Sequence, residues 1–213
     1  MRPDAQAAVL WLVVVAIGAY HGLNPAMGWP LAVANGLSAR RGAAVFATLV
    51  PLGAGHFLAM AVVLVPFALL STIAAWSRPI RLGAGGLLLL FGLYRLIDRR
   101  HPRWLGRVRP TQLALWSFLI ATAHGAGLML LPVALGLCTT PAGPALPPTA
   151  GAASALLVAG VHTAAMLAAG GCIAWAVYRY LGLGLLNRGW LNLEAVWAAS
   201  LVVAGGAGIA LAW

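Results

Sequence analysis

The histidines and methionines of this sequence occur in pairs. Four of the five histidines fall near the middle of long apolar segments, and each is followed by a methionine within six residues. An imidazole nitrogen with a thioether sulfur forms a soft to borderline ligand set, which suits Cu(I) and is tolerated by Ni(II), Co(II) and Zn(II). We therefore interpret the pairs as candidate metal ligands: His21 with Met27, His56 with Met60, His124 with Met129, and His162 with Met166.

Hard cations fit this pattern poorly. The only acidic residues are Asp4, Asp98 and Glu194, and none is expected inside a membrane. Mg²⁺ and Ca²⁺ prefer carboxylate and carbonyl oxygens, so they would lack ligands there. For the same reason, histidines are the only obvious proton carriers for coupled transport.

For any single pair, a purely structural role is an alternative to the interpretation as metal ligands. A histidine can donate to a carbonyl freed by proline or glycine, and methionine often fills gaps in a bundle. The matched positions of four pairs favour a functional central site. Asn24 could supply a further, weak substrate-binding oxygen or cap the helix after Pro25, and both roles stay open. Cys138 and Cys172 are interpreted as small apolar fillers.

The composition indicates the class of protein to which these residues belong. The 213 residues are 62% hydrophobic and 8% charged, and their mean hydropathy is +0.95. This excludes an ordinary soluble domain and predicts an all-α polytopic membrane protein, one membrane domain over residues 1–213. The first apolar run is interpreted as a retained span, and no aqueous domain is left to bind nucleic acid. The predicted spans cover about 7–37, 43–76, 80–97, 112–138, 149–178 and 190–213.

Arginines predict the topology. The basic residues are 13 arginines, and ten of them follow the first, third or fifth span. By the positive-inside rule, both termini lie on the non-cytoplasmic side of a plasma (inner) membrane, and the Arg-rich linker 95–110 lies in the cytoplasm. The lipid bilayer is thus one expected partner, and association into a homo-oligomer is left open.

An internal repeat organises the spans. HGLNPAMGWPLAVANGL in the first span matches HGAGLMLLPVALGL in the fourth, and GHFLAMAVV in the second matches VHTAAMLAA in the fifth. This predicts two three-helix repeats, A (about 1–100) and B (about 110–213), and an odd number of spans forces the second to be inverted. Pro25 and the glycines after His124 predict an interruption of the first helix of each repeat, where inverted-repeat transporters place binding sites.

The architecture and the two motifs HGLNPAMGWP and HGAGLMLLP resemble the lysine-exporter (LysE) superfamily, which includes the NicO nickel/cobalt transporters, the TauE exporters and the CcdA thiol-electron carriers. The resemblance implies a transporter fold with the two broken helices at its centre, and it suggests nickel or cobalt as substrate. NicO-type chains carry an aspartate with the first histidine, and CcdA-type chains pair cysteines from the first helix of each repeat. This sequence has neither feature.

Three functions follow from these patterns. The leading expectation is a transporter, not an enzyme, that moves Cu, Ni, Co or Zn ions through a central His/Met site. The first alternative is a membrane electron carrier whose histidines ligate haem as a cofactor. The second is an exporter of a small organic or inorganic anion, in which the histidines bind the solute or relay protons.

Overall fold

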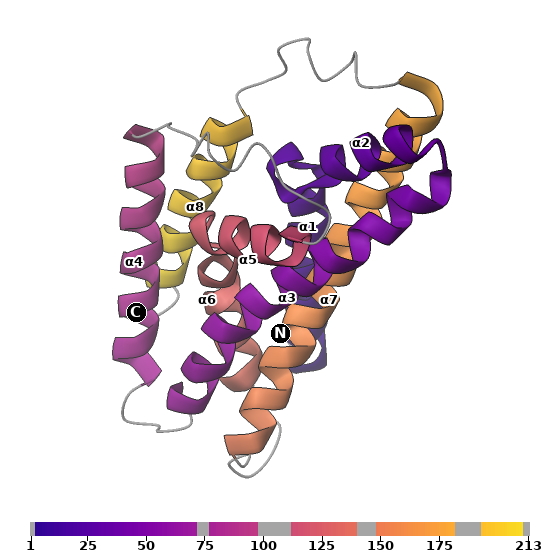
Figure 1. The fold of residues 1–213 in the computed structure, drawn as a ribbon. Coiled ribbons are helices and arrows are strands. Elements are labelled where there is room, and N and C mark those ends of the chain that lie inside the picture. The colour runs from indigo at the N-terminus through magenta and orange to yellow at the C-terminus, as the bar shows by residue number, and fades with distance from the viewer. Residues whose placement is uncertain (1–2, 72–76, 98–111, 140–147, 182–192, 211–213) are drawn as a thin grey trace.

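The structure is a computed structural model, and it describes residues 3–71, 77–97, 112–139, 148–181 and 193–210. Within these ranges every regular element is a helix, which confirms the all-α prediction (Figure 1). Most of the Arg-rich linker lies outside the described residues. The first half of the chain contains α1 (Pro3–Leu23), η1 (Pro25–Met27), α2 (Trp29–Ala39), α3 (Gly42–Ser71) and α4 (Ser77–Ile97). The second half contains α5 (Leu113–Ala123), α6 (Ala126–Thr139), α7 (Pro148–Ala176), the π-helical turn η5 (Val177–Leu181) and α8 (Leu193–Ala210).

The first apolar segment is interrupted just after His21, as the sequence predicts. Asn24 is extended (φ −71°, ψ 120°), and Pro25 begins the short η1 because proline lacks the N–H that would continue the ladder. Gly28 then adopts a left-handed conformation (φ 100°) that favours glycine, and α2 starts at the next residue. The indole of Trp29 donates to the carbonyl of Leu23 at 3.3 Å, which satisfies an oxygen freed by the break.

The fourth apolar segment is interrupted at the matching histidine. Helix α5 ends at Ala123, His124 follows, and Gly125 turns the chain with φ 71° before α6 begins at Ala126. This left-handed conformation is one that side chains with a Cβ rarely adopt. Both predicted interruptions are therefore confirmed. The first begins after Leu23, two residues beyond His21, and the second falls at His124.

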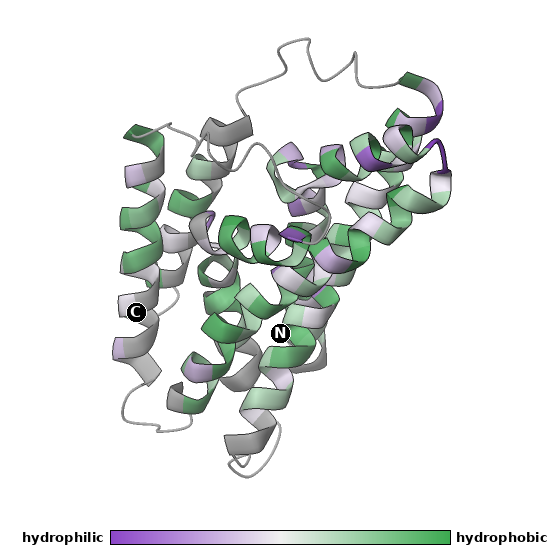
Figure 2. Ribbon diagram, in the orientation of Figure 1, coloured by the Kyte–Doolittle hydropathy of each residue, from purple (hydrophilic) through white to green (hydrophobic). Residues whose placement is uncertain are grey.

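Among the described residues, two helices are long and apolar enough to cross a bilayer. They are the stretches Gly42–Leu69, with 28 residues, and Gly151–Leu181, with 31. Helix α3, with 30 residues, is about 45 Å long, which exceeds the roughly 30 Å of hydrocarbon in a membrane. Apolar residues make up most of the length of the described helices (Figure 2). Leu12, Val50 and Val203 are 68%, 71% and 70% exposed on three different helices, as expected where lipid is the solvent.

The helices pack in a small number of extensive pairs. Helix α1 lies against α7, α3 lies against α5, α6 and α7, and α4 lies against α8 (Figure 1). Glycines let the backbones approach closely at three of these crossings. A Cβ on Gly22 would collide with the carbonyl of Met166, and one on Gly55 would collide with that of Ala114. Gly85 of α4 and Gly205 of α8 face each other between these two helices.

The α4–α8 contact yields a stability prediction. A Cβ on Gly205 would lie 2.8 Å from the carbonyl oxygen of Gly85 and 2.5 Å from the backbone nitrogen of Leu89. Because backbone cannot rotate away, Gly205→Ala should lower the free energy of unfolding by about 1–3 kcal/mol. Gly86→Ala is the matched control, since nothing lies within 4 Å of its added Cβ, and it should be neutral or stabilise by about 0.5–1 kcal/mol. Unfolding in mixed micelles measures both, and equal effects would contradict the packing shown.

Candidate metal centre

Three of the four predicted histidines meet in the interior of the bundle. They come from three helices, His21 near the end of α1, His56 in the middle of α3 and His162 in the middle of α7. Their ring centroids are 5.1 Å apart for His21 and His56, 5.2 Å for His21 and His162, and 5.6 Å for His56 and His162. All three side chains are at most 1% exposed. The fold thus brings these three histidines together, which their spacing along the chain could not show.

The helix crossings hold these rings together. A Cβ on Gly18 would lie 2.5 Å from the carbonyl oxygen of His162, so α1 and α7 touch backbone to backbone one turn before His21. Helix α3 packs against α7, which brings His56 to the same level. The close approach depends on Gly18 and Gly22, which are four residues apart on one face of α1, a spacing typical of tight helix contacts in membranes.

The spacing of the three rings matches that of a tetrahedral metal site. With metal–nitrogen distances of about 2.0–2.1 Å, the centroids of two ligating imidazoles would lie about 5.2 Å apart. Within the described ranges, however, no group of three or more His, Cys, Asp or Glu side chains is arranged so that it could hold a metal ion. Metal binding by these three rings would therefore require them to turn about the last side-chain bond, and rotation about this bond is soft in histidine.

Polar atoms at the cluster are buried without full hydrogen bonding. Among the described residues, Nε2 of His56 and Oγ1 of Thr163 have no hydrogen-bond partner. His162 interacts weakly with the backbone of Val14, but neither of its ring nitrogens makes a full hydrogen bond within the described part of the chain. Each such group costs about 1–3 kcal/mol. Buried polar atoms of this kind occur where strain is stored, where chemistry takes place, or where a water or an ion binds.

His124 lies close to this cluster with its ring fixed by the backbone. Its side chain is 2% exposed, and its Nδ1 lies 2.9 Å from the carbonyl oxygen of Ile120. Because a carbonyl only accepts, Nδ1 of the neutral ring donates and Nε2 carries the lone pair, the arrangement typical of a metal-binding histidine. His124 is near enough to interact electrostatically with His21 and His56.

The structure separates the four methionines into two kinds. Met27 and Met166 share a small buried cluster with Ile120, and both line a pocket beside the histidines. Met60 instead packs in the largest apolar cluster, among residues such as Leu64 and Leu130. Met129 packs against Leu88 and Leu201 of α4 and α8. The four predicted pairs are therefore not equivalent.

Asn24 acts as a cap in the structure. Its Oδ1 accepts a hydrogen bond from the backbone N–H of Ala26 at 3.0 Å, which is the capping role that the sequence left open. Asn24→Ala should therefore lower stability by about 1 kcal/mol and leave metal affinity unchanged. Asn24→Ser, which keeps a capping oxygen, should lose much less stability. Thermal unfolding with parallel metal titration measures both quantities, and a loss of metal affinity in the alanine variant would instead assign Asn24 as a ligand.

Sequence reasoning missed Thr163, which adjoins His162 and is buried at 6% exposure. Threonine in an apolar helix usually bonds to a carbonyl one turn back, so no signal in the sequence singled it out. The role of Gly18 and Gly22 could have been found from their spacing. Comparisons of the chain with protein-family models, curated proteins and solved structures found no match, so a functional interpretation depends on the site itself.

Proposed function

We propose that this protein is a membrane transporter for a soft or borderline transition-metal ion, with the histidine cluster as its central site. The observation that carries the proposal is the meeting of His21, His56 and His162 from three helices, buried and about 5 Å apart. Imidazole suits Cu, Ni, Co and Zn ions. His124 is the further candidate ligand, and its backbone bond already selects the required tautomer.

The packing of the helices supports the inverted-repeat arrangement with six spans. Exchanging the repeats converts α1 into α5, α2 into α6, α3 into α7 and α4 into α8. The observed contacts agree with this exchange, because α1 packs on α7 as α5 packs on α3, and α2 packs on α7 as α6 packs on α3, while α3–α7 and α4–α8 pair equivalent helices. A two-fold axis in the membrane plane would pass through the last two contacts and so beside His56 and His162.

The histidines lie where alternating access would need a substrate site. Both interrupted helices break at or just after a histidine of the set, and broken helices are where inverted-repeat transporters bind their substrates. Rocking one repeat against the other would expose the cluster alternately to the two sides. By the arginine distribution, the sides are the cytoplasm, with the linker 95–110, and the outside, with both termini.

Haem fits the cluster less well than a single ion. Two axial histidines on one haem iron would have centroids about 6.4 Å apart, with the whole macrocycle between the rings. The observed separations of 5.1–5.6 Å are shorter than this and leave no layer for a porphyrin between the rings. A single bound metal ion requires no such space.

Transport by the purified protein in lipid vesicles tests the proposal. Vesicles that contain a metal-sensitive dye should show uptake of Cu(I), Zn(II), Ni(II) or Co(II), and His56→Leu should reduce the initial rate at least about tenfold. His101→Leu is the control, because this histidine lies in the Arg-rich linker outside the apolar segments, and its rate should be unchanged. Metal uptake that is equal in all three proteins would overturn the proposal and favour the anion exporter.

A further inference from the structure

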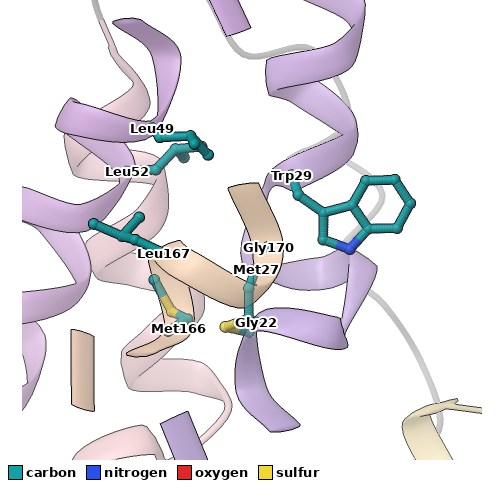
Figure 3. A pocket seen from close by; sticks show the side chains of 8 residues that line it. All are labelled: Gly22, Met27, Trp29, Leu49, Leu52, Met166, Leu167 and Gly170. Atoms are coloured by element: carbon teal, nitrogen blue, oxygen red, sulfur yellow. The ribbon is translucent and has the colours of Figure 1, made fainter. Parts of the chain in front are cut away.

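A small, partly open pocket with a cavity volume of about 10 Å³ is lined by residues that neighbour the histidine cluster along the chain. Its walls come from α1, η1, α2, α3 and α7. Figure 3 shows that the side chains of Met27 and Met166 extend toward one another across it. Both methionines are buried, at 6% and 3% exposure, and they belong to one contact cluster with Ile120. The remaining lining residues are Gly22, Trp29, Leu49, Leu52, Leu167 and Gly170.

Two of the pocket-lining residues are close neighbours of the histidines along α1 and α7. Gly22 lines the pocket and follows His21 directly, and a Cβ on it would strike the carbonyl of Met166. Met166 lies four residues after His162 on α7, which is about 6 Å along one helix face. An ion held between the two methionines would therefore be about one helical turn from the ring cluster, and Gly22 lies in close backbone contact with Met166 beside it.

The chemistry of the lining is selective. Among the described residues, the side chains that line the pocket include two thioethers and no carboxylate, hydroxyl or imidazole. Thioether sulfur binds soft monovalent Cu(I) and is a poor ligand for Zn(II), Ni(II) and Co(II). These lining side chains are also uncharged, which favours a monovalent ion, because a singly charged ion is less costly to desolvate than a divalent one.

We propose that Met27 and Met166 form a transit subsite for Cu(I) at the approach to the histidines. This inference rests on the proposed function and narrows its substrate to a soft monovalent ion. Met60 and Met129 do not belong to the subsite, since each packs in a different apolar cluster. The subsite captures Cu(I) between two sulfurs and passes it to the imidazoles one turn away.

Copper stoichiometry in detergent tests this subsite. Wild type, titrated with Cu(I) buffered by bicinchoninate, should bind two ions per chain, and the Met27→Leu/Met166→Leu variant should bind one. Cu(I) uptake into vesicles should fall at least about tenfold in the variant. Leucine conserves the methionine volume, so folding should be retained. Met129→Leu is the matched control, because Met129 is equally buried at 6% and should bind two ions.

X-ray absorption of the copper-loaded wild type detects sulfur ligands directly, so this measurement does not depend on whether a variant folds. A sulfur shell near 2.3 Å should be present, and the double variant should lack it. The proposal is overturned if wild type shows no sulfur shell, or if the double variant retains two copper ions.

Zn(II) binding, which depends on the histidines alone, should be unchanged by the methionine substitutions. Loss of the sulfur site with intact zinc binding supports the subsite, whereas failure of zinc to bind wild type would contradict the proposed function separately.

Discussion

His162→Leu is expected to abolish tight metal binding and, in the metal-free protein, to leave stability unchanged or raise it by up to about 2 kcal/mol. The two effects have one cause. Both ring nitrogens of His162 are buried without a full hydrogen bond among the described residues, which costs stability. Under the proposed function, a bound metal ion would offset this cost. Leucine of similar size removes that cost and the ligand together. Metal affinity should fall at least about 100-fold, or roughly 3 kcal/mol.

Opposite changes in stability and binding distinguish a ligand from a packing residue. Unfolding of metal-free protein in mixed micelles measures the first quantity, and titration with Zn(II) or Cu(I) measures the second. His101→Leu, outside the apolar segments, should change neither. If His162→Leu kept its metal affinity and lost more than about 2 kcal/mol of stability, the histidine would be a structural core residue.

Metal binding itself should stabilise the protein strongly. At a free concentration of 100 times Kd, a ligand that binds only the folded state adds about 2.7 kcal/mol. For a chain of 213 residues, this corresponds to an increase in Tm of about 5–11 °C. Removal of the ion with a chelator should lower Tm back to its metal-free value, because the stabilisation comes only from binding of the ion to the folded state.

Variants identify the residues behind this increase. His56→Leu and His162→Leu should show little or no metal-induced shift in Tm, whereas Asn24→Ser should show the full shift, because Asn24 caps η1. A shift of equal size in the histidine variants would mean that the metal binds elsewhere on the chain.

The sequence predicted the features that depend on local chemistry. The break after His21 follows from proline, which cannot donate to the helix ladder, and the break at His124 follows from a glycine that adopts φ 71°. The six apolar segments correspond to the helices or broken helices of the structure. Such features need only the neighbouring residues, so a single sequence contains enough information to find them.

Features that depend on how helices rotate and pack were not accessible in the same way. The sequence predicted that all four methionines serve one site, because their pairs look equivalent along the chain. Of these four, only Met27 and Met166 line the pocket together. Met129 follows Gly125 into α6, whose start turns it toward α4 and α8. The positions of such side chains depend on contacts between distant segments, and spacing along the chain does not encode these contacts directly.

The central claim is that histidines from three helices bind one metal ion. X-ray absorption of the Zn(II)-loaded protein tests it most directly, since imidazole rings give a characteristic multiple-scattering pattern. The account predicts one zinc per chain with three to four imidazole nitrogens at about 2.0–2.1 Å, and one imidazole fewer in His162→Leu. A zinc shell without imidazole scattering, or one that His162→Leu leaves unchanged, would contradict it.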